Sequence, residues 1–162
     1  MKIIINENAV LKGLLFTFVC LFTLNFAVHF AWAVYGRDSL LGFTRLFNFY
    51  EEANLPTWYT SLLLNISACF LSVIASAEQN KKERAYWFLL AMIFVFLSID
   101  ETAKVHELIG GILSNTGVQQ LLPNEDSSSW VFYGGAMCFL VVVAFLRFWL
   151  RLESRIRALF FA

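Results

Sequence analysis

The chain has 162 residues, of which 59% are hydrophobic and 15% are charged, and its formal net charge is zero. A soluble domain carries about 45–50% apolar and about 25% charged residues, so this composition excludes an ordinary soluble domain and indicates an integral membrane protein. The sequence has no basic block with interleaved aromatic residues, which argues against a nucleic-acid partner.

Four long apolar segments predict transmembrane helices at 13–35, 57–77, 85–109 and 130–150. The expected fold class is therefore an all-α integral membrane protein, a four-helix transmembrane bundle in a single domain over residues 1–162. If the N-terminus is cytoplasmic, nine of the 12 Lys and Arg residues lie on the cytoplasmic side. The positive-inside rule then predicts a multipass protein with both termini in the cytoplasm.

The first predicted span carries two polar residues on one face. Asn25 and His29 are four residues apart, so a helix places both side chains on the same side. His29 lies about 25 Å from Lys12 along the helix, near the outer surface of the membrane. A lone His within a span commonly forms a hydrogen bond in helix packing, and the alternative is a ligand or a proton-carrying group.

The connection after the first span predicts a short interfacial helix at 39–53. Its apolar side chains gather on one side: Leu40, Phe43, Leu46, Phe47 and Tyr50. Arg45, Asn48 and Glu52 lie opposite, which is the pattern of a helix in the plane of the membrane interface. Pro56 then suits the first turn of the second span.

Small and polar residues form a stripe along the second predicted span. They recur every three or four residues: Ser61, Asn65, Ala68, Ser72 and Ser76. Small residues let helices approach closely, and Ser or Asn forms hydrogen bonds across the contact. The stripe therefore predicts helix packing, and a polar pore lining is the alternative.

The third predicted span is short for a membrane and ends in acids. The segment 85–99 has no charged residue, which gives about 22 Å of helix against a hydrocarbon core of about 30 Å. A spanning helix is thus expected to continue to Ile109, where the glycine pair 110–111 predicts its end. Asp100 would then lie near the outer edge of the hydrocarbon, where an ionisable group is costly unless it is paired or functional.

On a continuous helix, the polar residues that follow this segment divide into two groups. Asp100, Lys104 and Glu107 form one stripe, a ladder in which Lys104 bridges both acids. Glu101 lies about 100° from this ladder, and His106 lies on the other side of the helix. Two interpretations stay open: a salt-bridge ladder, or a polar site for an ion or a proton.

A polar site at the outer surface would gather residues from several spans, and a metal ion is one possible occupant. The chain has no Glu-x-x-His motif, which di-iron carboxylate bundles use twice. No metal or other cofactor is therefore predicted. If a metal does bind, its expected ligands are Glu101, Asp100, His29 and Glu52.

The last predicted span continues into a basic tail, residues 147–162. Its arginines are expected close to anionic lipid headgroups on a cytoplasmic helical extension: Arg147, Arg151, Arg155 and Arg157. The first three recur every four residues, which predicts one continuous helix. Positive-inside charge alone explains the same residues.

A short motif closes the third apolar segment. It reads Phe96-Leu97-Ser98-Ile99-Asp100-Glu101, followed by His106-Glu107. The string resembles a pattern in uncharacterised bacterial multipass membrane proteins, in which an aromatic-rich span ends in Ser-x-Asp-Glu and a His-Glu pair follows. The resemblance covers the segment 96–107. It implies a bacterial inner (plasma) membrane and no particular activity.

These features favour a non-enzymatic function. We expect an oligomeric, ion- or proton-channel-like or sensing subunit, with Glu101, Asp100 and His29 as a polar switch. Two other classes stay open: a metal-dependent membrane enzyme acting on a lipid-like substrate, and a scaffold or defence-type membrane effector. The expected partners are membrane lipids, including anionic headgroups, and either further copies of the chain or a protein on the cytoplasmic side.

Overall fold

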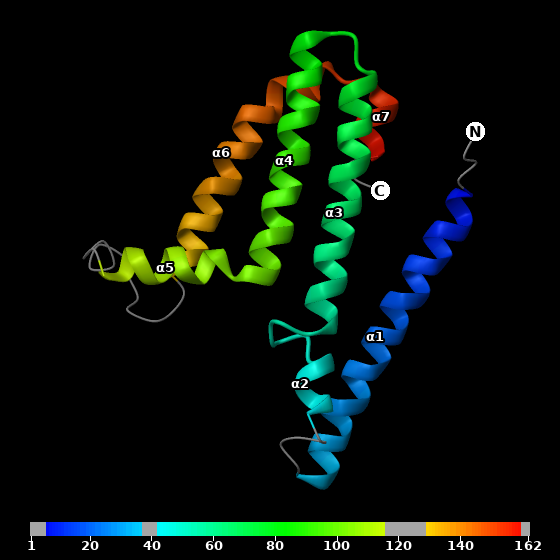
Figure 1. The fold of residues 1–162 in the computed structure, drawn as a ribbon, viewed down its shortest axis with the longest axis vertical. Helices are drawn as coiled ribbons and strands as arrows, with labels where there is room; N and C mark the ends of the chain where they lie inside the picture. Colours follow the sequence, from blue (N-terminus) through cyan, green and yellow to red (C-terminus); the bar gives the residue numbers. More distant parts are fainter. Residues whose placement is uncertain (1–5, 37–41, 116–128, 160–162) are drawn as a thin grey trace. The chain divides into compact units, whose positions relative to one another are not determined.

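The computed structural model describes residues 6–36, 42–115 and 129–159, and every regular element in these ranges is a helix (Figure 1). The helices are α1 (Glu7–Tyr35), α2 (Phe43–Phe47), α3 (Leu55–Ala77), α4 (Lys81–Ala103), α5 (Val105–Asn115), α6 (Ser129–Arg151) and α7 (Ser154–Leu159). Within the described ranges, four helices (α1, α3, α4 and α6) are long and apolar enough to cross a membrane. The predicted all-α membrane class is therefore confirmed.

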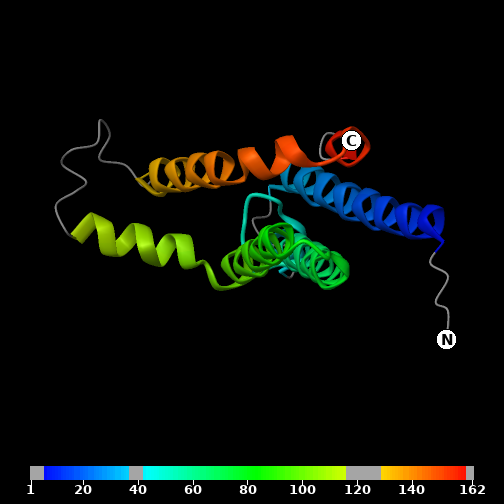
Figure 2. The same cartoon turned by 90° about the horizontal axis from the view of Figure 1, so that it is seen from above.

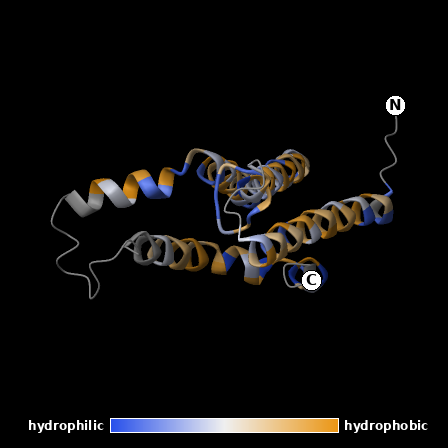
Figure 3. Cartoon of the chain, turned by 90° about the horizontal axis from the view of Figure 1, so that it is seen from below, coloured by the Kyte–Doolittle hydropathy of each residue, from blue (hydrophilic) through white to orange (hydrophobic). Residues whose placement is uncertain are grey.

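Large apolar side chains cover the long helices and face outward. Figure 3 shows hydrophobic residues along each of these helices and hydrophilic residues in α7 and at the start of α5. Phe16 and Phe26 on α1 are 71% and 66% exposed. Such exposure is costly in water, whereas hydrocarbon solvates these side chains and requires only that the backbone be paired within the helix.

The chain divides into two compact units, residues 1–62 and 63–162, and α3 runs from the first into the second. In the first unit, α1 begins at Asn6, whose side chain accepts a hydrogen bond from the Ala9 N–H, and ends at Gly36, which has a left-handed backbone. α2 lies against α1. The Tyr59 hydroxyl donates to the backbone carbonyl of Leu14 at 2.9 Å, which ties the start of α3 to α1.

In the second unit, α3 and α4 form an antiparallel hairpin around the turn 78–80 (Figures 1 and 2). Small buried side chains, Ala68 on α3 and Ala91 on α4, leave room for a close approach. The Asn65 amide donates to the hydroxyl of Ser98, which joins the two helices. This half of the stripe predicted on α3 therefore packs against α4.

The apolar core of the second unit lies where α4 begins and α6 ends. Its buried residues are Ala75, Trp87, Phe148 and Leu152. The Phe148 ring stacks on Tyr86 and meets Trp87 edge-on, with ring centroids 5.0 Å apart in both pairs. Aromatic pairs of this geometry add about 0.5–1.5 kcal/mol beyond the area they bury. The cluster therefore holds α6 against the α3–α4 hairpin at this end.

The predicted interfacial helix at 39–53 is longer than the helix observed. α2 covers Phe43–Phe47 only, and residues 37–41 lie outside the described ranges. The backbone leaves the helix at Asn48, which is extended, and takes a left-handed conformation at Ala53. The Asn54 amide donates hydrogen bonds to backbone carbonyl groups of this segment, and these bonds take the place of helical ones.

The predicted third span, 85–109, is wrong at its second boundary. α4 ends at Ala103, and Lys104 has left-handed angles, φ 53° and ψ 43°. Its N–H donates to the Asp100 carbonyl at 2.8 Å, which closes the last turn of α4. The chain then turns away as α5, which lies across the end of α4 and against α6 (Figure 1). Because α5 starts anew at Val105, the glycine pair 110–111 falls inside it and does not end a helix.

The continuous helix predicted through the basic tail is also wrong. α6 ends at Arg151, and α7 starts at Ser154. Leu152 is buried in the aromatic core, and its N–H donates to the Trp149 carbonyl three residues back, so the helix is replaced by a tight turn. The turn places Arg157 over the Trp149 ring, with its guanidinium carbon 5.6 Å from the ring centroid.

The left-handed residue Lys104 generates a first prediction. A side chain in this conformation costs about 1 kcal/mol relative to glycine, so Lys104→Gly should raise the free energy of unfolding by roughly 0.5–1 kcal/mol. The same substitution at Lys82, which lies in the first turn of α4, should lower it by about 1 kcal/mol. Denaturation of the detergent-solubilised protein, followed by circular dichroism, measures both. A loss of stability in Lys104→Gly would contradict the assigned corner.

Candidate functional site

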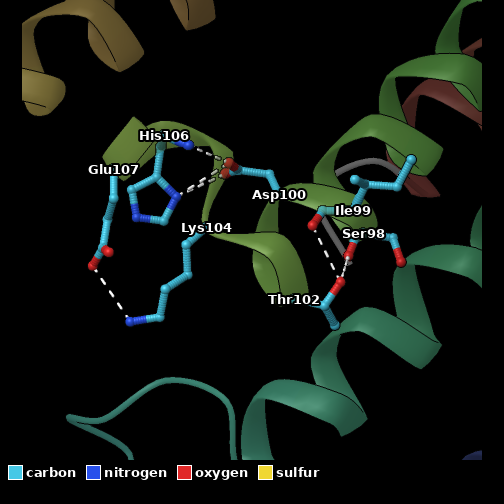
Figure 4. A network of polar contacts seen from close by, with 7 residues as sticks. All are labelled: Ser98, Ile99, Asp100, Thr102, Lys104, His106 and Glu107. Atoms are coloured by element: carbon cyan, nitrogen blue, oxygen red, sulfur yellow. Dashed lines mark hydrogen bonds and ion pairs between the residues drawn. The ribbon is translucent and has the colours of Figure 1, made fainter. Parts of the chain in front are cut away.

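Polar side chains gather at two places, one in each unit. We call the first the asparagine network; it comprises Asn25, His29, Asn48, Glu51, Asn54 and Thr57. We call the second the corner cluster; it comprises Asp100, Thr102, Lys104, His106 and Glu107 (Figure 4). Each is described by itself.

Asn25 and His29 connect α1 to the end of α2 and to the residue that follows it. The Asn25 amide donates to the Phe47 carbonyl at 3.1 Å, and the His29 Nε2 lies 3.2 Å from the Asn48 Oδ1. The His29 ring also meets the ring of Tyr50 edge-on, 6.0 Å between centroids. The shared face predicted for Asn25 and His29 therefore contacts two consecutive residues of one segment. Within the first unit, His29 makes the packing hydrogen bond expected of an intramembrane His.

Asn54 is the centre of the network and is buried. Its amide nitrogen lies 2.6 Å from the Asn48 carbonyl and 2.8 Å from the Glu51 carbonyl. Its Oδ1 accepts from the N–H of Thr57 at 3.1 Å and from the Thr57 hydroxyl at 3.0 Å, which caps α3. One side chain thus ends the irregular segment and starts the next helix. Sequence reasoning missed it, although an Asn two residues before Pro56 is an N-cap signal.

In the corner cluster, Asp100 joins the end of α4 to the start of α5. Its Oδ1 accepts from the backbone N–H of His106 at 2.7 Å. The His106 Nδ1 lies 3.1 Å from Oδ2 and 3.2 Å from Oδ1 of the same carboxylate. Figure 4 shows the imidazole ring facing Asp100 across the turn. A carboxylate at a helix N-terminus is favourable because it satisfies a backbone donor and opposes the positive end of the helix dipole.

Lys104 and Glu107 complete the corner. The Lys104 Nζ lies 3.4 Å from the Glu107 Oε1, on the outer side of the turn. An exposed pair of this kind stabilises a fold by about 0–1 kcal/mol. The Thr102 hydroxyl donates to the carbonyls of Ser98 and Ile99, at 3.2 and 3.1 Å, so both of these contacts lie within α4.

Of the two ion pairs in the ladder predicted for a continuous helix, one is present. Lys104 bridges Glu107 as predicted, but Asp100 holds His106, which a continuous helix would carry to the opposite side. The physical reason is the left-handed turn at Lys104, which redirects the whole of α5. Glu101, the next residue along α4, is half-buried.

The Asp100–His106 pair has a definite chemical capacity. Because Nδ1 faces the carboxylate, the contact fixes the orientation of the imidazole, a group that can carry a proton or bind a ligand. The side chains of His106 and Asp100 are 26% and 23% exposed, so the pair is mostly buried but still has access to solvent. The predicted gathering of His29 and Glu52 with Asp100 and Glu101 draws on both units, and it stays a prediction, as does the metal site built on it.

The other residues predicted to have a functional role lie on α3 and in the basic tail. Asn65 packs against α4, and Ser61 is buried on α3, whereas Ser72 and Ser76 are exposed and line a groove beside α4. Arg147 and Arg151 are exposed at the end of α6, and Arg155 is exposed on α7. Arg157 is half-buried against Trp149.

Comparison with known proteins identifies one family. Residues 13–162 match the family described as Domain of unknown function (DUF8692). The chain belongs to this family. No curated protein and no solved structure matches it. The family match spans both units and both polar clusters.

The buried amide of Asn54 generates a second prediction. Asn54→Asp keeps the oxygen that caps α3 but replaces the donor with an oxygen that faces carbonyl groups, so it should lower the free energy of unfolding by about 1–3 kcal/mol. Asn6→Asp is the matched control, because the exposed Asn6 caps α1 through its oxygen; it should change stability by less than about 0.5 kcal/mol. Denaturation midpoints distinguish the two. Equal effects would argue against the donor role of Asn54.

The double function of Asp100 generates a third prediction. Asp100→Ala removes both the α5 cap and the His106 contact and should cost about 1–3 kcal/mol, whereas His106→Ala removes the ring contact but keeps the cap and should cost about 1 kcal/mol. In the His106→Ala background, Asp100→Ala should still cost about 1 kcal/mol through the lost cap. Unfolding of the three variants measures this. No residual cost in the double variant would contradict the cap.

Proposed function

We propose that the chain is a non-enzymatic membrane subunit that responds to protons through the corner cluster. The single observation that supports this most directly is the Asp100–His106 pair, which links two helices at a left-handed residue. The Asp100 carboxylate accepts a charge-assisted hydrogen bond from a neutral imidazole and forms an ion pair with a protonated one, and the ion pair is the stronger contact. Gain of a proton by His106 therefore tightens the corner, and loss of that proton loosens it.

The surrounding charges modulate this response. Lys104 and Glu107 form an ion pair beside the Asp100–His106 contact. In the second unit, the part of α3 over residues 63–77 has no charged residue, and the arginines of α6, Arg147 and Arg151, lie at its far end from the corner. Movement of α5 would pass to α6, against which it lies.

The rest of the proposal concerns topology and assembly. We propose that α1, α3, α4 and α6 cross a bacterial inner membrane with both termini in the cytoplasm, because most Lys and Arg residues lie on that side. α2 and α5 would then lie at the outer interface and α7 at the inner one. The large exposed apolar area of the helices is consistent with lipid contact and with association of several copies.

A second candidate is a metal-dependent membrane enzyme that acts on a lipid-like substrate. It is favoured by one observation, the orientation of His106 by a carboxylate through Nδ1, an arrangement also found behind metal-binding His residues. Native mass spectrometry of the purified protein discriminates the two. A stoichiometric metal that disappears in His106→Ala would favour the enzyme.

The fourth prediction tests the response to protons. Spin labels at Met92 on α4 and Ile112 on α5, both exposed, report the angle of the corner in a background in which the three native cysteines are replaced. The population of the shorter distance between the labels should be higher at pH 5.5 than at pH 8, because a protonated imidazole forms an ion pair with Asp100.

The controls for this experiment are two substitutions. Asp100→Asn keeps a capping oxygen but cannot form an ion pair, so its distances should not depend on pH. His29→Gln, in the other unit, should keep the pH dependence of the parent. A parent distance distribution that is the same at both pH values would overturn the proposal.

A further inference from the structure

The end of the α3–α4 hairpin opposite the corner holds a groove that the proposed function does not use. Its volume is about 430 Å³, within the range of about 300–1,000 Å³ that is typical of small-molecule sites. On α3 it is lined by Ser72, Ala75 and Ser76. On α4 it is lined by Lys81, Arg84, Ala85 and Phe88. Both sides belong to the same unit.

The wall of the groove is apolar in practice, although two of its residues are serines. The Ser72 hydroxyl donates to the Ala68 carbonyl at 2.8 Å, and the Ser76 hydroxyl donates to the Val73 carbonyl at 2.7 Å. Their protons are therefore used within α3. Phe88 is 55% exposed and lies one helical turn beyond Arg84. The wall suits a hydrocarbon chain better than a polar solute.

The groove carries two positive charges at one end. Lys81 and Arg84 lie in the first turn of α4 and are exposed. Neither has an ion-pair partner among the described residues. The nearby acids are held elsewhere, since Glu78 accepts from the Asn80 N–H and Glu83 from the Asn80 amide. The cations are thus available to an anion at the groove, while the acids serve the start of the helix.

We infer that this groove binds one anionic phospholipid. Its phosphate would lie between Lys81 and Arg84, and an acyl chain would run along Ala75, Ala85 and Phe88. Charge complementarity selects an anionic headgroup, and the helices that form the groove are both candidate spans, so lipid reaches it from the surrounding bilayer. The inference rests on α3 and α4 crossing a membrane and not on the Asp100–His106 response.

The fifth prediction concerns this lipid. In native mass spectrometry from mild detergent, the protein should retain one phosphatidylglycerol in preference to phosphatidylcholine with the same acyl chains. The double variant Lys81→Gln with Arg84→Gln should weaken phosphatidylglycerol binding about 30-fold, or about fivefold per cation. Ala85→Leu fills the groove without changing its charge and should also weaken binding. Circular dichroism shows that the variants retain their helices.

The matched control is Lys12→Gln with Lys82→Gln, which removes the same charge from exposed residues that do not line the groove. It should bind phosphatidylglycerol within about twofold of the parent. An equal loss in the control and the groove variants would overturn the proposal in favour of unspecific attraction to charge. Displacement of the lipid by an equal concentration of glycerol phosphate would also overturn it, because the apolar wall would then contribute nothing.

Discussion

A chain in lipid must pair its backbone N–H and carbonyl groups within itself, because hydrocarbon offers them no partner. The long helices meet this constraint without help from side chains. Each place where a helix stops or starts must meet it in another way, and here short polar side chains do so. Asn6 caps α1, Asn54 caps α3, and Asn80 caps α4. The form of the connections follows from where these residues stand.

The corner between α4 and α5 follows the same rule with a different residue. Its cap is a carboxylate, Asp100, which reaches six residues ahead to the N–H of His106. An asparagine amide does not ionise, whereas Asp100 carries an ionisable carboxyl group and its partner is an imidazole. The corner is therefore the described helix start at which capping is coupled to charge, which is why the proposed response is placed there and not in the asparagine network.

The two ends of α4 have different chemistry. At the corner, ionisable groups are paired with one another, as in Asp100 with His106 and Lys104 with Glu107. At the start of α4, Lys81 and Arg84 face an apolar groove while the neighbouring acids are held by Asn80. Paired charges stabilise a fixed geometry, and charges without an internal partner are suited to an external one. One helix thereby connects the proposed sensing element to the proposed lipid site.

The amino-acid sequence by itself determined the fold class and most of the span boundaries. A membrane span needs only length and hydrophobicity, which are local properties, so the segments 57–77 and 130–150 agree with α3 and α6 within two residues. The polar stripe predicted on the second span includes Asn65, which donates a hydrogen bond to Ser98 on α4. The predicted pairing of Lys104 with Glu107 is present, because a contact between residues three apart in the sequence is also a local property.

Only the tertiary structure decided where the helices break. Helical periodicity continues through Lys104 and Leu152 in the sequence, but left-handed angles at the first and burial of the second in the aromatic core interrupt it. Each break is stabilised by a contact with a residue that periodicity places elsewhere: Asp100 with His106, and Arg157 with Trp149. A pattern read along one helix cannot contain such contacts, because they exist only after the chain has turned.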